Sequence, residues 1–400
     1  MIHAINSRAF FKTFKEALIA YSFDIGGLFA GFIVASQLNI FERSPWIIAV
    51  YPAILSARGV ISGLFCGRLS TALHLGTMYP RFFGNTKSFY KLFEAIIVIT
   101  LGTSFAMSSV SLVFGSLFWG ITFTDFPNIL MVVVGTMTLG LSLSLVTITI
   151  AFVTFKKGLD PDVIVYPIMS TVADIVITIC YVLTLNLFFL SKYIVLFLGL
   201  LLVILAIYFL LQNIHEEVFF KTIKESLLTL LFVAFIVNIT GTILLSINTS
   251  LKVVRRKEIY TVYPALIDTV GDVGSVVGST ATTKLALGLL KPSFSDMRNH
   301  ATQIFGAWAA AIVVFVFFSA FSLFINGMFT LYAFLSFASL LLTTNIIAVT
   351  AIVLISHAVA ILTFQKGLDP DNFVIPIESS LADSVTTIAL LVALSLLELI

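Results

Sequence analysis

Charged side chains are scarce in this sequence. Only 10% of its 400 residues are charged, whereas 59% are hydrophobic and the mean hydropathy is +1.11. Soluble domains carry about 25% charged residues, so this composition excludes a soluble globular protein. The formal net charge of +2 is too small to indicate a nucleic-acid partner. We therefore predict an integral membrane protein made of α-helices, in contact with the lipid bilayer, because backbone polar groups in lipid must be satisfied within each segment.

The sequence also lacks the motifs of common enzymes. It has no GxxxxGK[ST] phosphate-binding loop, no paired His and Cys at metal-binding spacing, and no Ser–His–Asp arrangement. Its two cysteines, Cys66 and Cys180, fall in apolar stretches and are expected to be reduced. The N-terminal segment is short, basic and amphipathic, and we expect no cleavable signal peptide. We predict a protein that is not an enzyme.

One stretch occurs twice and organises the chain. KKGLDPDVIVYPIMSTVADIVIT (156–178) returns as QKGLDPDNFVIPIESSLADSVTT (365–387), 209 positions later (365 minus 156). The two copies are identical at more than half of their positions, which indicates an internal repeat. Each copy begins with Gly-Leu-Asp-Pro-Asp and continues into an apolar helix that carries one carboxylate, Asp174 or Asp383.

A second pair of segments supports the duplication. YPAILSARGVISGLFCGRLSTALHLG (51–76) aligns with YPALIDTVGDVGSVVGSTATTKLALG (263–288) at an offset of 212 (263 minus 51). The copies share the Tyr-Pro-Ala start, a central glycine (Gly59 and Gly271) and the final Leu-Gly. Their small residues permit close helix packing, and their proline and glycine content predicts a bent or broken span.

Apolar segments of about 20 residues, the length that crosses a bilayer, can be counted along the chain. We predict eleven, in the order five, one and five, at 16–38, 46–76, 92–119, 127–155, 162–190, 193–212, 224–247, 259–289, 302–325, 329–363 and 371–399.

The single extra span sets the predicted symmetry. A five-span unit begins and ends on opposite sides of the membrane, and one linking span restores the starting orientation. The predicted fold is therefore all-α, with two parallel five-helix repeats related by a pseudo-twofold axis along the membrane normal. The expected domains are the first repeat (1–190), a linker helix (191–215) and the second repeat (216–400).

Lysine and arginine placement predicts the orientation. The loops on the N-terminal side hold more of these residues than the loops on the opposite side, although Lys252–Lys257 runs against the trend. By the positive-inside rule we expect a multi-pass protein of the plasma membrane with its N-terminus in the cytoplasm and its C-terminus outside.

The repeated aspartates are the leading candidates for chemistry. A carboxylate inside a membrane span costs about 2.5–3.5 kcal/mol and normally faces water or a partner. Carboxylate oxygens suit hard divalent cations, and Mg²⁺ is often held through one or two of them while keeping much of its water. Hydroxyls one helical turn before and after each aspartate complete a polar stripe. The predicted metal-binding residues are thus Asp174, Asp383, Ser170, Ser379, Thr178 and Thr387.

Other ionisable residues distinguish the two halves. Asp268 and Asp272 lie on one face of the second repeat's second span, where the first repeat has Ser56 and Val60 with Arg58 nearby. Two interpretations stay open: Asp272 and Asp268 contribute to ion binding, or Arg58 pairs with an aspartate for structural reasons. Further intramembrane candidates without an equivalent in the other half are Asp24, Glu378 and His357.

With these residues in view, the chain resembles the magnesium transport families typified by the bacterial MgtE channel and the animal solute carrier family 41. GLDPDVIVYPIMSTVAD and GLDPDNFVIPIESSLAD resemble the fifth-span motif of that membrane domain, and RGVISGLFCGRLSTALHLG resembles its second-span motif. The resemblance implies that Asp174 and Asp383 match the pore carboxylate that holds a hydrated Mg²⁺. It also implies that one duplicated chain supplies both halves of the pore, as a pseudo-dimeric monomer.

The sequence therefore predicts a divalent-cation transporter with Mg²⁺ as the expected ion and a path between the repeats. Two alternatives stay open. The chain could be an exchanger that couples Mg²⁺ to Na⁺ or H⁺, or a non-conducting membrane assembly or sensor protein whose carboxylates serve only as polar contacts.

Overall fold

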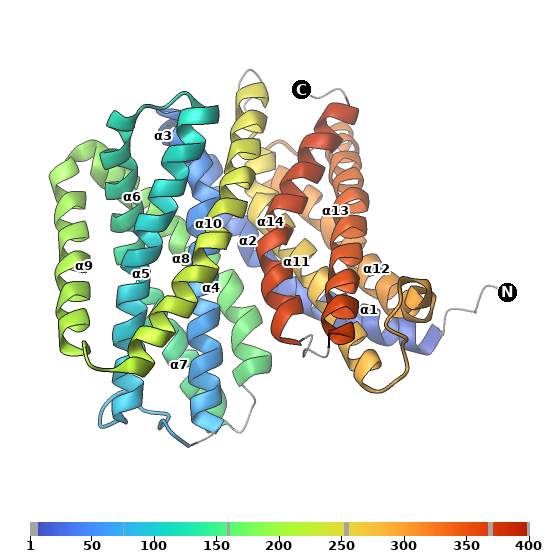
Figure 1. The fold of residues 1–400 in the computed structure, drawn as a ribbon. Helices are drawn as coiled ribbons and strands as arrows, with labels where there is room; N and C mark the ends of the chain where they lie inside the picture. The colour runs from blue at the N-terminus through green and yellow to red at the C-terminus, as the bar shows by residue number, and fades with distance from the viewer. Residues whose placement is uncertain (1–6, 75, 158–160, 252–255, 367–370, 398–400) are drawn as a thin grey trace. The chain divides into compact units, whose positions relative to one another are not determined.

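The computed structural model describes residues 7–74, 76–157, 161–251, 256–366 and 371–397. Every regular element in this part of the chain is a helix (Figure 1). The longer helices are α1 (Ser7–Tyr21), α2 (Ile25–Ser36), α4 (Pro45–His74), α5 (Lys87–Phe114), α6 (Phe126–Gly140), α7 (Ser142–Lys156), α8 (Pro161–Leu190), α9 (Lys192–Gln212), α10 (Glu217–Leu251), α11 (Lys257–Ala286), α12 (Ala301–Ile325), α13 (Leu331–Gln365) and α14 (Asp371–Leu396).

Short elements connect these helices. A 3₁₀ turn, Ser22–Asp24, separates α1 from α2, and α3 is the four-residue helix Leu38–Phe41. A π-helical segment, Gly115–Trp119, ends α5, and the 3₁₀ segments η3 (Phe123–Asp125) and η4 (Phe294–His300) precede α6 and α12. The fold is thus all-α in the described residues, as the composition predicts.

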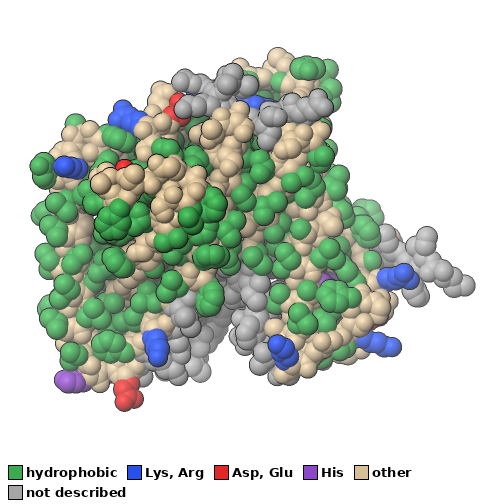
Figure 2. All heavy atoms as spheres, turned by 45° about the horizontal axis from the view of Figure 1, so that its top comes forward, with side chains coloured by type: hydrophobic (Ala, Val, Ile, Leu, Met, Phe, Trp, Pro, Cys, Tyr) green, Lys and Arg blue, Asp and Glu red, His purple; other side chains and the backbone are tan. Residues whose placement is uncertain are grey.

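Eight helical segments of the described chain are long and apolar enough to cross a membrane. They are Ser7–Ser36, Lys87–Trp119, Phe123–Lys156, Thr171–Leu190, Lys192–Gln212, Leu230–Ser250, Phe294–Ile325 and Leu331–Gln365. Hydrophobic side chains are spread over the face drawn in Figure 2, and the charged side chains on it are sparse. The membrane class is therefore supported, whereas the count of eleven spans stays a prediction.

Three predicted spans are not among these segments: 46–76 (α4), 259–289 (α11) and 371–399 (α14), in which Leu381–Leu396 is a shorter apolar helix. The first two, α4 and α11, contain a proline. Both are continuous helices, with Pro52 inside α4 and Pro264 inside α11. Each proline lacks an N–H group and removes one intrahelical hydrogen bond, yet neither ends its helix. Neither helix is broken, and a bend in either one stays a prediction. A break occurs instead in the predicted span 127–155, at Leu141 between α6 and α7.

The described chain forms two compact units that differ from the sequence repeats. One unit is Ser36–Leu245, and the other combines Met1–Ala35 with Ser246–Ile400. We call them the first unit and the second unit, after the repeat that supplies most of each. The N-terminal helices α1 and α2 thus belong with the second repeat, and most of α10 belongs with the first. The domain boundaries predicted above follow the sequence duplication and stay a prediction.

In the first unit, α4 packs on α5, α6, α7 and α8, and α9 packs along α5, α6 and α8. The buried residues of α9 are Val195, Gly199, Leu202 and Ala206, spaced as one helical face. Helix α10 joins through polar contacts in which Ser111 Oγ donates to Asn238 Oδ1 (2.8 Å) and Trp119 Nε1 donates to Thr242 Oγ1 (2.9 Å).

In the second unit, α11 packs on α12, α13 and α14, and α13 packs on both α12 and α14. Helix α1 lies against α12, where a Cβ built on Gly306 would be 3.1 Å from the carbonyl oxygen of Phe10. The unit therefore repeats the frame of the first one, because α11 takes the place of α4 and α14 that of α8.

Glycine permits the same helix crossing in each unit. A Cβ on Gly31 of α2 would collide with the backbone oxygen of Thr261 in α11, and a Cβ on Gly241 of α10 would collide with that of Ala49 in α4. Ala49 and Thr261 are equivalent positions of the repeat (49 plus 212 is 261). Each half thus contains a close contact between two helices that leaves no room for a side chain larger than that of glycine.

Candidate functional site

The two repeated aspartates lie at equivalent places in the two units. Asp174 is on α8 and is 9% exposed, and Asp383 is half-buried on α14. Both helices are continuous around the aspartate, so neither carboxylate depends on a loop for its position. Because the two residues belong to different compact units, their convergence on one ion stays a prediction.

A tyrosine–threonine hydrogen bond anchors each aspartate-bearing helix. Tyr51 Oη lies 2.8 Å from Thr178 Oγ1 in the first unit, and Tyr263 Oη lies 2.8 Å from Thr387 Oγ1 in the second. All four side chains are at most 2% exposed. Each threonine follows its aspartate by one helical turn. The contact therefore fixes the position of the aspartate along the axis of the neighbouring helix, α4 or α11.

The direction of the second of these bonds follows from its neighbours. Thr387 Oγ1 donates to the backbone oxygen of Asp383 at 2.6 Å, which uses its one proton. Tyr263 must then donate to Thr387. The hydroxyls of Thr178 and Thr387 are therefore engaged within the protein, which favours a positioning role for both predicted ligands.

The second unit brings further carboxylates close to Asp383. A Cβ on Gly271 of α11 would lie 3.4 Å from Cβ of Ala382 on α14, so the two helices touch there. Asp272 directly follows Gly271 on α11, and Asp383 directly follows Ala382 on α14. Asp268 precedes Asp272 by one turn, and both are half-buried. The unequal acidic content predicted for the two halves is thus located beside the repeated aspartate.

The first unit carries Arg58 on α4, the helix that corresponds to α11. Its side chain is fully buried, and its Nη2 donates to Ser144 Oγ at 2.8 Å. Its Nε and Nη1 have no hydrogen-bond partner among the described residues. The equivalent of Arg58 in the second unit is Val270 (58 plus 212), and that of Ser144 is Val353 (144 plus 209), both buried. The guanidinium and its acceptor are therefore both replaced by valine.

Asp24 belongs to the second unit, although it comes from the first predicted span. It is 3% exposed at the turn before α2, and it accepts a hydrogen bond from Thr269 Oγ1 of α11 at 2.6 Å. Thr269 directly follows Asp268 in sequence. The N-terminal segment therefore contributes a carboxylate, Asp24, to the second unit, next to the helix α11 that carries Asp268 and Asp272.

Some predicted residues lie outside the described side chains. The backbones of Ser170, Ser379 and Glu378 are helical, but their side chains are outside the described part of the structure. Within the described residues, no cluster of three or more His, Cys, Asp or Glu side chains could hold a metal ion. His357 stacks on His300 with a ring-centroid distance of 5.8 Å.

Sequence reasoning missed the two tyrosines. It also missed that α1 and α2 pack with the second repeat and that most of α10 packs with the first. The signal for Tyr51 and Tyr263 was present, because both open the repeated Tyr-Pro-Ala motif. The sequence gives little signal that α2 lies with the second repeat and α10 with the first, since glycines such as Gly31 and Gly241 occur in many of its apolar segments. Apolar composition does not identify the neighbouring helix, because lipid is as apolar as another helix.

Together these features define a duplicated helical membrane protein with one equivalent buried carboxylate helix in each half. A family model described as MgtE, divalent cation transporter, matches the chain twice, at residues 51–184 and 263–393. The two matches cover more than half of the 400 residues, and the chain belongs to this family. Searches of curated proteins and of solved structures find no significant match.

The family match confirms the resemblance found in the motifs. Both matched segments begin at the Tyr-Pro-Ala tyrosine, Tyr51 or Tyr263, and include the repeated aspartate. MgtE is a family of divalent cation transporters and not of enzymes, in agreement with the predicted class of function.

Proposed function

We propose that this chain transports Mg²⁺ across the plasma membrane along a path between its two repeats. In this proposal Asp174 and Asp383 hold one hydrated ion together, and each repeat contributes one of them. The repeats are parallel and related by a pseudo-twofold axis along the membrane normal. The chain spans the membrane eleven times with its N-terminus in the cytoplasm, and it needs no second copy to complete the path.

The observation that carries the proposal is the equivalence of the two aspartate helices. Both units hold the helix with a tyrosine–threonine bond of 2.8 Å, one turn beyond the aspartate. The same support keeps both carboxylates at equivalent positions of the two repeats. Two such frames are what a single ion shared between the repeats requires.

The chemistry of the ligands fits a hydrated divalent cation. Two carboxylates supply the charge to neutralise it, and Mg²⁺ is bound through few protein oxygens because it dehydrates reluctantly. Ser170 and Ser379 are proposed to contact its water shell. Asp268 and Asp272 are proposed to raise the local cation concentration next to Asp383.

The flux of Mg²⁺ into liposomes that contain an internal Mg²⁺ indicator tests the proposal. Wild type is compared with Asp174→Asn and Asp383→Asn, and a Na⁺ or pH gradient is imposed in turn. We expect both variants to abolish flux while the protein stays folded, and we expect wild-type flux to ignore the gradients.

Asp125→Asn is the matched control for these variants. Asp125 is a carboxylate in the first unit that accepts a hydrogen bond from Thr122 N at 2.9 Å before α6, and asparagine caps helices equally well. Normal flux in Asp174→Asn and Asp383→Asn would overturn the proposal. Flux that follows a Na⁺ or pH gradient would replace the channel with an exchanger, and absence of flux in folded wild type would favour a non-transporting role.

A further inference from the structure

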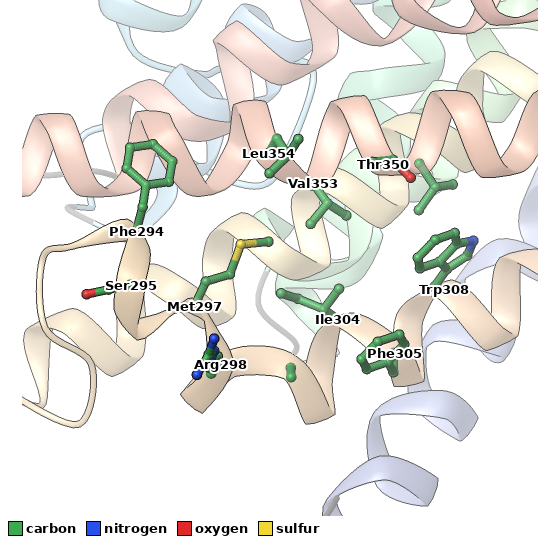
Figure 3. Close-up of a pocket in the computed structure, with 12 residues that line it drawn as sticks. Phe294, Ser295, Met297, Arg298, Ile304, Phe305, Trp308, Thr350, Val353 and Leu354 are labelled. Carbon is green, nitrogen blue, oxygen red and sulfur yellow. The ribbon is translucent and has the colours of Figure 1, made fainter. Parts of the chain in front are cut away.

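The second unit contains a cavity that the transport proposal does not use. It has a volume of about 670 Å³ and lies between α12 and α13, with η4 at one end. Its size falls within the range of about 300–1,000 Å³ that ligand pockets occupy. Figure 3 shows Val353 and Leu354 of α13 facing Ile304 and Trp308 of α12 across this space. The cavity is therefore a slot between two helices that are both apolar enough to span a membrane.

The wall of the slot is aromatic and fixed in place. Trp308 Nε1 donates to Asn345 Oδ1 on α13 at 2.8 Å, which holds the indole ring. Phe305 stacks on Trp308 with a centroid distance of 6.3 Å and an angle of 4° between the rings. Phe305 and Leu354 are each 47% exposed, so the slot opens to the surroundings of the protein. At membrane depth only an apolar occupant can fill such an opening without losing hydrogen bonds.

One end of the slot carries an arginine side chain. Arg298 of η4 lines the cavity, and its guanidinium has no hydrogen bond or ion pair among the described residues. The adjacent Asp296 is already engaged, because its carboxylate accepts from Lys291 N (2.7 Å) and from Asn299 Nδ2 (2.6 Å). A long apolar slot with a free guanidinium at its end matches a ligand with an acyl chain and an anionic head.

The first unit shows how the corresponding helices are covered. There α9 packs along both α5 and α6, which correspond to α12 and α13. Of the described helices, α11 and the short η4 pack on both α12 and α13; α11 corresponds to α4, and η4 lies at one end of the slot. The second unit therefore leaves exposed a helix pair whose equivalent is covered by an apolar helix in the first.

We propose that this slot binds a phospholipid with an anionic headgroup. One acyl chain lies between α12 and α13 against Trp308 and Phe305, and the phosphate is held by Arg298. Ala301 and Trp308 are seven residues apart on α12, a distance of about 10 Å along the helix axis. The acyl chain is proposed to lie along this stretch of the helix. On the predicted orientation, η4 faces the cytoplasmic leaflet, where anionic lipids are found.

Lipid retention measured by native mass spectrometry tests this site. The full chain is reconstituted in vesicles of phosphatidylglycerol and phosphatidylcholine with identical acyl chains at equal amounts, then extracted and analysed. We expect wild type to retain phosphatidylglycerol about fivefold over phosphatidylcholine, the size of effect expected for one basic side chain at an anionic lipid surface. Arg298→Gln should bring the ratio close to one while lipid is still retained.

A second variant distinguishes the binding of the acyl chain from the binding of the headgroup. Ala301 lines the slot, and Ala301→Phe should fill it and lower the retention of both lipids. Arg81→Gln is the control, because Arg81 is an exposed arginine in a loop of the first unit, outside the slot. Equal retention and equal lipid ratio in wild type, Arg298→Gln and Ala301→Phe would overturn the proposal. Unchanged melting temperatures in the variants establish that they are folded.

Discussion

The two units share a frame and differ in the charge that they bury. Each has a glycine crossing, a tyrosine–threonine bond and a helix with one aspartate. The first buries Arg58 against Ser144, whereas the second has valine at both positions and instead holds Asp24, bonded to Thr269, beside Asp268 and Asp272. Shared features identify what both halves of a duplicated transporter need, and the unequal ones identify where the halves have become specialised.

Burial makes this difference costly to reverse. A guanidinium removed from water must be paired or hydrogen-bonded, so the polar neighbours of Arg58 are part of its site. The second unit lacks the acceptor Ser144, since buried Val353 stands at the equivalent position and buried Val270 replaces Arg58. Placing the residue of one half at the equivalent position of the other half, without its neighbour, is therefore expected to destabilise the protein.

The largest effect is expected from moving the arginine to the other half. Val270→Arg places a charge among valines, and leaving a buried charge unpaired costs about 3–5 kcal/mol. The matched variant Arg58→Met keeps volume and removes charge, so its stability should be close to wild type or higher. Melting temperature in detergent and the fraction of monodisperse protein measure both. A Val270→Arg protein as stable as wild type would refute the difference between the units.

The glycine crossings should respond equally in the two halves. Gly31→Ala and Gly241→Ala each place a methyl group on a backbone oxygen, and overpacking of this kind costs about 1–3 kcal/mol or more. Gly59→Ala is the control, because a Cβ there meets no atom within 4 Å. Alanine should then stabilise the helix by about 0.5–1 kcal/mol. A loss in only one crossing variant would show that the frames are not equivalent.

A smaller, matched loss is expected from the tyrosine hydroxyls. Tyr51→Phe and Tyr263→Phe each remove one buried hydrogen bond, worth about 0.5–1.5 kcal/mol. Tyr193→Phe, on an exposed tyrosine, should change nothing. Thermal unfolding of the three variants measures stability, and Mg²⁺ flux measures whether the aspartate height matters. Tyr51→Phe and Tyr263→Phe proteins that match Tyr193→Phe in both measurements would remove the positioning role.

The smallest effect concerns an ion pair of the first unit. Lys91 Nζ lies 2.7 Å from Glu216 Oε1 and lowers the pKa of that carboxyl through a hydrogen bond and charge attraction. The pair stabilises the fold above the ordinary glutamate pKa, and this stability is lost as the pH falls through the lowered value. The melting temperature should fall slightly with acid in wild type. Lys91→Gln should remove that part of the acid response, and salt should weaken it.

The sequence predicts the membrane class, the duplication and the repeated aspartates because each depends on local composition or on identical residues. It does not predict that α2 and α10 lie in units with helices of the other repeat, since most of their side chains are apolar and the polar partners of α10, Ser111 and Trp119, are far away in sequence. It also does not predict the slot at Trp308, because that depends on how α12 and α13 are spaced. The sequence predicts the hydroxyls of Thr178 and Thr387 as ligands, whereas the fold shows that Tyr51 and Tyr263 contact them.

The central claim is that Asp174 and Asp383 hold one ion together. A double-mutant cycle on Mg²⁺ affinity tests it most directly, with Asp174→Asn, Asp383→Asn and the double variant compared by equilibrium binding to the full chain. If the two carboxylates share one ion, each single variant should lose nearly as much affinity as the double, and the stoichiometry should be one. Additive losses, or two ions bound per chain with one lost in each single variant, would contradict the shared site.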